Sequence, residues 1–235
     1  MRASVAADSL SGHLRRQRVV HMLHIGKTGG TALKHALRAC PNPPSLRLLL
    51  HGHVVPLSAI PLRDEVFFFL RDPVSRYVSG FNSRLREGRP SNQRPWTPGE
   101  RRAFERFGTP DELARALSAD DQRVSAEARD AMARIGHVRY PLSRWLGNAE
   151  LLRKHRDRIV LIGCVNTLES DFERLKDALS LPASCRLPDS DDAAHRAPSN
   201  GSNGSTALSD EAVVNLRQWY RADYDLIEAC RMLRA

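Results

Sequence analysis

The chain has 235 residues, of which 41% are hydrophobic, and this is enough for a globular domain with a sizeable core. Its formal net charge of +9 at pH 7 predicts binding to anions, such as nucleic acid, a polyanionic cofactor or an acidic acceptor. Aromatic residues make up only 6% and the arginines are scattered, so the pattern of a basic and aromatic nucleic-acid surface is missing and we expect no nucleic-acid partner.

The amino-terminal stretch and the cysteines bear on where the protein works. Residues 1–18 lack the apolar segment of a signal peptide, and we expect them to form a flexible leader. No apolar run reaches the length of a membrane span. The cysteines form no C-x-x-C pair, which favours reduced thiols and a cytoplasmic location; they are Cys40, Cys164, Cys185 and Cys230.

A strand, a glycine-rich turn and a helix are predicted over residues 19–37. Residues 19–25 are apolar and partly β-branched, as in a short buried strand. Gly26, Gly29 and Gly30 interrupt this run and can take positive φ. From Thr31 onward, the apolar residues have the spacing of one helical face; they are Ala32, Leu33, Ala36, Leu37 and Cys40.

Such a turn aims backbone N–H groups and the positive end of a helix at an anion. Lys27 adds a positive charge, and Thr28 and Thr31 add hydroxyl donors. We interpret the turn as a phosphate cradle; an ordinary strand-to-helix turn with a solvated lysine is the alternative. The cradle residues are Gly26, Lys27, Thr28, Gly29, Gly30, Thr31 and Ala32. The turn fails the P-loop pattern G-x-x-x-x-G-K-[ST], because position 21 is His21 rather than glycine.

Two further strands are predicted at 46–50 and 65–70, and the second is continuously apolar, as in a parallel sheet buried on both faces. His51 and His53 follow the first of them directly. Two histidines in one loop are more often surface or structural residues than catalysts, so the pair alone does not decide its role.

The segment R-D-P-V-S-R-Y-V-S-G-F at 71–81 follows the apolar strand. Pro73 suits the first position of a helix, with Asp72 as its N-cap. Arg71, at the strand end, and Ser79, on the helix, can then converge on one anion.

A helical insert is predicted at about 82–136, with capping boxes that begin at Thr97 and Thr109 and helices near 100–107, 110–118 and 121–134. The insert is either a lid over an acceptor or a solvated cap. Next come, in order, a strand at 158–163, a helix at 168–179, a polar flexible loop at about 182–206 and a last helix from residue 209. The order predicts one α/β domain over 19–235, a three-layer sandwich with a mostly parallel central sheet and ligands at the carboxyl ends of its strands.

The turn, read as I-G-K-T-G-G-T, resembles the 5′-phosphosulfate loop of sulfotransferases that use 3′-phosphoadenosine 5′-phosphosulfate (PAPS), with Gly26 in place of the usual proline. Residues 71–81 match the 3′-phosphate segment of that family, R-D-P-x-x-R-x-x-S-x-[FY], at every fixed position. The resemblance implies PAPS as donor, 3′-phosphoadenosine 5′-phosphate (PAP) as product, and no metal. It assigns the cradle to the 5′-phosphosulfate and Arg71 and Ser79 to the 3′-phosphate. Arg196 and Asn200, in the polar loop, are candidates for contacts with the adenosine and 3′-phosphate.

The string His51-Gly52-His53-Val54 is similar to the H-G-H-V of the uronyl 2-O-sulfotransferases of heparan sulfate. This likeness implies that His53 is the general base, that His51 assists it, and that the acceptor is a carbohydrate hydroxyl. Lys27 would stabilise the departing 5′-phosphate. Two alternatives remain open at this point: a P-loop nucleotide kinase, and a basic module that binds glycan or nucleic acid without catalysis.

Overall fold

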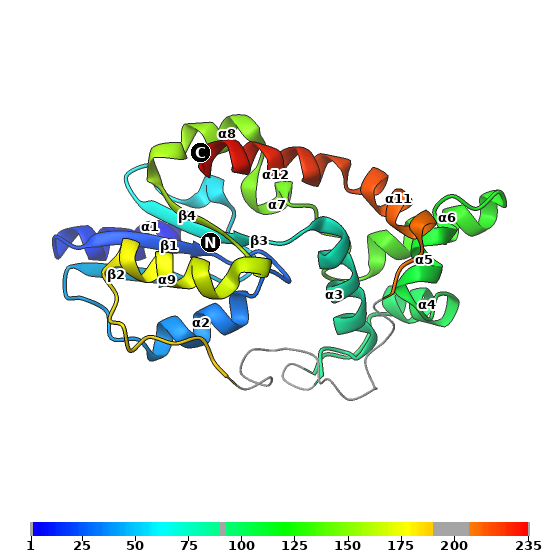
Figure 1. Cartoon of the computed structure of the whole chain (residues 1–235), viewed down its shortest axis with the longest axis horizontal. Coiled ribbons are helices and arrows are strands. Elements are labelled where there is room, and N and C mark those ends of the chain that lie inside the picture. Colours follow the sequence, from blue (N-terminus) through cyan, green and yellow to red (C-terminus); the bar gives the residue numbers. More distant parts are fainter. Residues whose placement is uncertain (1, 90–92, 190–206, 235) are drawn as a thin grey trace. The chain divides into compact units, whose positions relative to one another are not determined.

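The structure is a computed structural model that describes residues 2–89, 93–189 and 207–234. The described residues of 1–71, 142–195 and 226–235 form one compact unit, here called unit 1. Those of 72–141 and 196–225 form a second, unit 2 (Figure 1). The sequence predicted a single domain, whereas contacts within the chain divide it at Arg71 and Asp72, inside the R-D-P segment.

Unit 1 is built on a sheet of four strands, all paired in parallel, in the order β2-β1-β3-β4 (Figure 1). The strands are β1 (Arg18–Leu23), β2 (Leu46–Leu50), β3 (Glu65–Leu70) and β4 (Ile159–Cys164). Met22 of β1 lies opposite Leu50 of β2 and Phe67 of β3, so these three strands end at one edge of the sheet. The predicted strands and the parallel α/β fold are confirmed.

Helices α2 (Gly30–Ala39) and α9 (Leu168–Leu179) form a core with one face of the sheet. Because successive strand residues alternate between faces, only every second side chain of β1 and β3 belongs to this core. The core residues include Val20, Met22, Phe67 and Phe69 from the strands, and Leu33, Leu37, Phe172 and Leu175 from the helices.

A disulfide joins Cys40, which ends α2, to Cys185, which follows α9. The expectation of four reduced thiols is therefore wrong for this pair, while Cys164 and Cys230 take part in no disulfide. The two partners are 145 residues apart in the sequence, and no spacing rule connects residues that only the fold brings together.

Residues expected to form a flexible leader form helix α1 (Arg2–Leu14), which packs against β1. Val5 and Ser9 are buried, and a Cβ atom on Gly12 would lie 2.7 Å from a methyl carbon of Val19. Val5, Ser9 and Gly12 are four and three residues apart, so they lie on one face of the helix, and this face consists mostly of small residues. This face escaped the sequence analysis because it contains only one strongly apolar side chain.

Unit 2 is helical, and its core is formed by α3 (Pro73–Leu85), α4 (Pro98–Arg106), α5 (Pro110–Ala116), α6 (Gln122–Arg134) and α11 (Asp210–Trp219). The three insert helices and the capping boxes of Thr97 with Glu100 and of Thr109 with Glu112 are confirmed. Asp72 is the N-cap of α3, as predicted, and accepts a hydrogen bond from the Ser75 amide.

The remaining elements are α7 (Ser143–Leu146), α8 (Ala149–Lys154), α12 (Arg221–Arg234) and the short 3-10 turns Leu57–Ala59, Arg156–Arg158 and Val165–Thr167. One terminal helix was predicted from residue 209, but Tyr220 separates α11 from α12. Tyr220 is buried and donates a hydrogen bond to the carbonyl oxygen of Val138. Within the described residues, the helices are too short or too polar to span a membrane.

Candidate active site

The glycine-rich turn leaves the sheet after β1 and leads into α2. Lys27 has φ 68° and Gly29 has φ 76°, so two residues of the turn have left-handed backbone conformations. The helix begins at Gly30, and the first amide that bonds back into it is that of Leu33, to the carbonyl oxygen of Gly29. The first amides of a helix lack intrahelical partners. The amides of Gly30 to Ala32 lie in this first turn, where the sequence predicted an anion site, and their binding of an anion stays a prediction.

Thr28 stabilises this turn through a buried hydrogen bond. Its side chain is buried, and its hydroxyl donates to the carbonyl oxygen of Ile25 at 2.9 Å. That hydroxyl is used within the turn, and its predicted contact with a phosphate stays a prediction. Lys27 is half-buried and Thr31 is exposed.

His24 connects the turn to the histidine loop. Its side chain is 4% exposed and lies against Gly30, where an added Cβ would come within 2.1 Å of the imidazole Cδ2 atom. Only glycine fits at position 30 with this ring in place. The ring of His24 also packs on that of His53, with centroids 3.8 Å apart.

His53 is held by two hydrogen bonds. Its Nδ1 atom lies 3.2 Å from the carbonyl oxygen of His24, and its own carbonyl oxygen accepts from the indole Nε1–H of Trp145 at 2.7 Å. Because a carbonyl can only accept, Nδ1 of a neutral His53 carries the proton and Nε2 has the lone pair. The residue is exposed, yet desolvation of its ring lowers its pKa, with Lys34 and Lys27 adding to the shift. His53 is thus neutral near pH 7 with a proton-accepting nitrogen.

His51 has different surroundings. Its Nε2 atom lies 2.8 Å from Nδ1 of His21, and Nε2 of His21 lies 2.9 Å from Oδ2 of Asp64. His21 and Asp64 are buried, whereas His51 is half-buried. The pKa of His51 is lowered to about 4, mainly because the ring is buried and next because His21 lies nearby. Lys34 donates to the carbonyl oxygen of His51 at 3.3 Å.

The R-D-P segment divides between the two units. Arg71 is half-buried and directly follows β3, so it leaves the sheet at the same edge as the glycine-rich turn. Asp72 caps α3 and also accepts from the Tyr224 hydroxyl, and Arg76 is buried against Asp223 at 3.1 Å. Asp72 and Arg76 therefore stabilise contacts within unit 2. Ser79 is half-buried on the same helix.

The structure brings the glycine-rich turn, His51, His53 and Arg71 to one edge of the unit 1 sheet. Ser79 lies on α3, which belongs to unit 2. Arg196 and Asn200 lie outside the described residues. The roles assigned to all of these residues stay predictions.

Three residues next to the site were not predicted from the sequence: His24, which follows β1, His21 within β1, and Asp64, which precedes β3 and contacts His21. A signal was present, because histidines at 21 and 24 interrupt an otherwise apolar strand segment. A polar side chain in a buried strand is costly unless it is hydrogen-bonded, so each of them implied a partner.

A family model described as the sulfotransferase family matches residues 64–228, more than two thirds of the chain. The chain belongs to the sulfotransferase family. It is therefore an enzyme that transfers sulfuryl groups, and the match includes the R-D-P segment and the helical insert. The match begins after the glycine-rich turn and the histidine loop, so the argument for those residues rests on their geometry. Among curated proteins and among solved structures, no significant match to this sulfotransferase is found.

Proposed function

We propose that this sulfotransferase transfers the sulfuryl group of PAPS to a carbohydrate hydroxyl. The observation that carries the proposal is the position of His24, whose ring lies against Gly30 and whose carbonyl oxygen orients His53. One residue thereby connects the turn suited to a phosphate with an imidazole suited to accept a proton.

The donor is inferred from two anion-binding features. The 5′-phosphosulfate would lie at the first amides of α2, beside Lys27 and Thr31. The 3′-phosphate would be bound by Arg71, whose planar guanidinium can form two parallel hydrogen bonds to phosphate oxygens, together with Ser79. ATP has no 3′-phosphate, so this second contact would select PAPS over ATP.

In the proposed reaction the acceptor hydroxyl oxygen forms a bond to sulfur while the bond from sulfur to the 5′-phosphate oxygen breaks. The hydroxyl proton moves to Nε2 of His53, and the electron pair of the broken bond stays on PAP. The protein contributes positioning and stabilisation of charge, as in phosphoryl transfer. Lys27 and the amides of Gly30, Thr31 and Ala32 stabilise the negative charge that develops on the 5′-phosphate. No step is assigned to a metal.

The carbohydrate acceptor rests on the resemblance of the H-G-H-V loop to that of uronyl 2-O-sulfotransferases. The test is transfer of labelled sulfate from PAPS to a panel of acceptors: uronate-containing oligosaccharides, neutral oligosaccharides, a tyrosine peptide and a lipid alcohol. We expect transfer to a saccharide, and loss of transfer in Lys27→Ala but not in Lys154→Ala, which alters a lysine at the end of α8. Labelling of the peptide or lipid alone would overturn the acceptor assignment.

The kinase alternative is disfavoured by His21. The P-loop pattern needs glycine at that position, yet His21 is a buried strand residue hydrogen-bonded to Asp64. Thermal-shift measurements separate the two donors: PAP should raise the melting temperature more than ATP with magnesium. The opposite order would favour phosphoryl transfer. Binding of sugars without any transfer from PAPS would favour a non-enzymatic module.

A further inference from the structure

Asp64, His21 and His51 form a hydrogen-bonded chain that runs from the protein interior to the histidine loop. We propose that Asp64 and His21 are positioning residues that fix the tautomer of His51 and stabilise its ring when it takes up a proton. The proposal rests on the proposed function, since it gives His51 the means to assist His53 in proton transfer.

The order of donors and acceptors along the chain follows from Asp64. Its ionised carboxylate only accepts, so Nε2 of His21 carries a proton and donates to it. Nδ1 of neutral His21 is then an acceptor, and Nε2 of His51 must be the donor across the 2.8 Å contact. The remaining nitrogen of His51, Nδ1, therefore keeps its lone pair and can accept a proton.

The carboxylate of Asp64 is suited to this task because it is ionised and shielded. Burial alone would raise the pKa of Asp64, but hydrogen bonds from neighbouring side chains, His13 and His21 among them, outweigh burial and lower it. Its side chain is completely buried. A negative charge at this place stabilises an imidazolium two hydrogen bonds away, because the protein interior screens charge less than water does.

Other charged groups also face this chain. They are Asp8 and His13 of α1, Lys34 of α2, Arg63, whose Nε lies 4.0 Å from Asp64, and Arg158, which donates to the main-chain oxygen of Asp64 at 3.4 Å. The cations oppose proton uptake by His51, and Asp8 and Asp64 favour it. When Nδ1 of His51 takes up a proton, that ring becomes an imidazolium and no proton moves to Asp64.

The test begins with nitrogen NMR of the histidine rings in the unmodified protein, which needs no activity. We expect His51 and His21 to carry their protons on Nε2 and to have bare Nδ1 atoms near pH 7. A protonated Nδ1 in neutral His51 would overturn the proposal without touching the proposed function.

The second measurement is a double-mutant cycle with sulfate transfer as readout. Asp64→Asn should lower kcat about tenfold or more while PAP affinity stays constant, and should add little to His51→Ala. His13→Gln is the matched control, because it removes a hydrogen bond to the same carboxylate at 2.6 Å but leaves His21 in place. Independent, multiplying losses from Asp64→Asn and His51→Ala would refute the positioning role, even in an active sulfotransferase.

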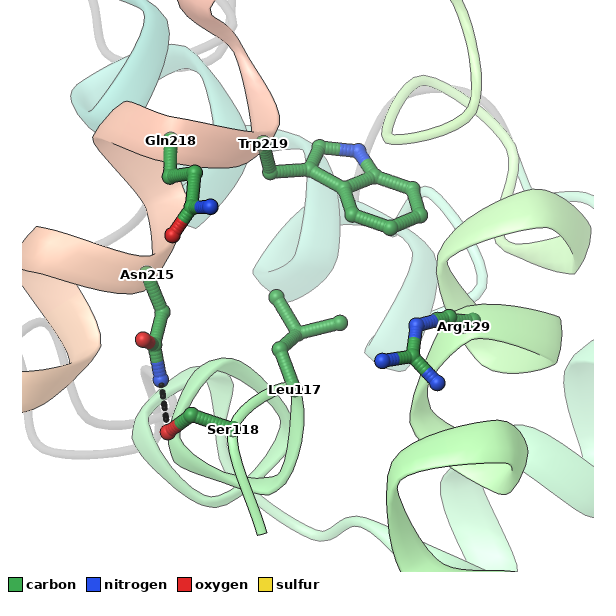
Figure 2. Close-up of a pocket in the computed structure, with 6 residues that line it drawn as sticks. All are labelled: Leu117, Ser118, Arg129, Asn215, Gln218 and Trp219. Atoms are coloured by element: carbon green, nitrogen blue, oxygen red, sulfur yellow. Dashed lines mark hydrogen bonds between the residues drawn. The ribbon is translucent and has the colours of Figure 1, made fainter. Parts of the chain in front are cut away.

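A second inference comes from a pocket in unit 2. The pocket, of about 350 Å³, lies between the end of α5 and helices α6 and α11 (Figure 2). It is lined by Leu117, Ser118, Arg129, Asn215, Gln218 and Trp219. None of these belongs to the predicted site.

The lining offers an aromatic face, a cation and a fixed amide. Trp219 lines the pocket and is 42% exposed, so part of its indole ring is accessible to a ligand. The amide nitrogen of Asn215 donates to Ser118 Oγ at 2.7 Å, which leaves the Asn215 carbonyl oxygen as an acceptor (Figure 2). Arg129 bonds only to Ser125 Oγ within the described part of the chain, at 3.2 Å.

Neighbouring arginines of α4, α5 and α6 have carboxylate partners: Arg115 contacts Glu211, Arg106 and Arg123 share Glu127, and Arg134 contacts Asp130. Arg129 has no carboxylate within ion-pair distance in the described residues. We infer that this pocket binds an acidic sugar unit, whose ring would stack on Trp219 and whose carboxylate or sulfate would pair with Arg129. This inference rests on the proposed function, which takes a carbohydrate as the acceptor.

Calorimetric titration without donor tests the pocket separately from transfer, with a glucuronate-containing hexasaccharide and a neutral hexasaccharide as probes. Arg129→Gln should weaken binding of the acidic probe about fivefold and leave the neutral one unchanged. Trp219→Leu should weaken binding of both. Arg134→Gln, on the same helix, is the control. Equal binding by all variants would overturn the inference, while binding without any sulfate transfer would overturn the proposed function instead.

Discussion

The Nδ1 atom of His53 and the carbonyl oxygen of His24 lie 3.2 Å apart, and this contact determines which nitrogen of His53 can accept a proton. A main-chain carbonyl does not titrate, so the contact keeps the Nδ1 proton in place at every pH at which the ring is neutral. The catalytic nitrogen of the proposed base is therefore Nε2.

His53→Ala should lower kcat by about 10²–10⁴-fold, the usual contribution of a positioned general base. PAP affinity should stay within about twofold, because the proposed phosphate contacts come from other residues. Sulfate-transfer kinetics and PAP calorimetry measure the two effects. His35→Ala, an exposed histidine on α2, serves as the control. Undiminished turnover in His53→Ala would remove this residue from the mechanism.

The pH dependence of stability follows from the lowered histidine pKa values. His51 titrates with a pKa of about 4 in the folded protein, against 6.5 in the unfolded chain, and the pKa values of His21 and His53 are lowered in the same direction. Between pH values of about 4 and 6.5, the unfolded state binds more protons than the folded state does. The free energy of unfolding therefore falls as the pH drops from about 6.5 to 4. Melting temperatures across this range should decline, and less steeply in His51→Gln. A flat profile in the unmodified protein would contradict the burial of these rings.

Most of the fold could be predicted from local patterns. The continuous apolar run at 65–70 predicted β3, and the capping boxes at Thr97 and Thr109 predicted where α4 and α5 begin. Both features depend on residues that are close together in the sequence. The same holds for the turn before α2, since Gly29 is followed by a helix with an apolar face, whereas the binding of a phosphate there stays a prediction.

The parts that sequence reasoning missed depend on distant residues. The Cys40–Cys185 disulfide and the pairing of His21 with Asp64 connect different elements of the fold. The hydrogen bond from the Thr28 hydroxyl to Ile25 was not predicted for a related reason, because a pattern of residue types does not give the direction of a side chain.

Arg71→Ala should weaken PAP binding by about tenfold or more, because a charge-assisted pair with phosphate is lost. Affinity for adenosine 5′-phosphosulfate, which lacks the 3′-phosphate, should change little. Calorimetry with both nucleotides gives the comparison, with the exposed Arg156→Ala as control. Equal losses for both nucleotides would mean that Arg71 does not contact the 3′-phosphate.

Glu100→Gln should destabilise unit 2 by about 3–5 kcal/mol, because it leaves the buried guanidinium of Arg84 without its counter-charge. Glu100 accepts from Arg84 Nε at 2.6 Å and Nη2 at 2.9 Å, and although burial opposes ionisation, these bonds and those from Thr97 and Gly136 lower its pKa to about 2. Urea unfolding monitored by circular dichroism measures the loss. Glu127→Gln, which alters an exposed carboxylate paired with Arg106 and Arg123, should cost much less. Similar costs for both variants would refute the importance of the buried pair.

Removal of the disulfide should cost about 2–5 kcal/mol of unfolding free energy, since the bond closes a long loop and limits the unfolded chain. Cys185→Ser tests this by urea unfolding, with Cys164→Ser, at a cysteine outside the disulfide, as control. Titration of thiols in the denatured, unreduced protein should find two, and reduction should raise the number to the four cysteines of the sequence. Four thiols before reduction would contradict the bond. Because disulfides persist mainly in oxidising compartments, the same titration on protein from its native source tests the cytoplasmic location, which was argued from reduced cysteines.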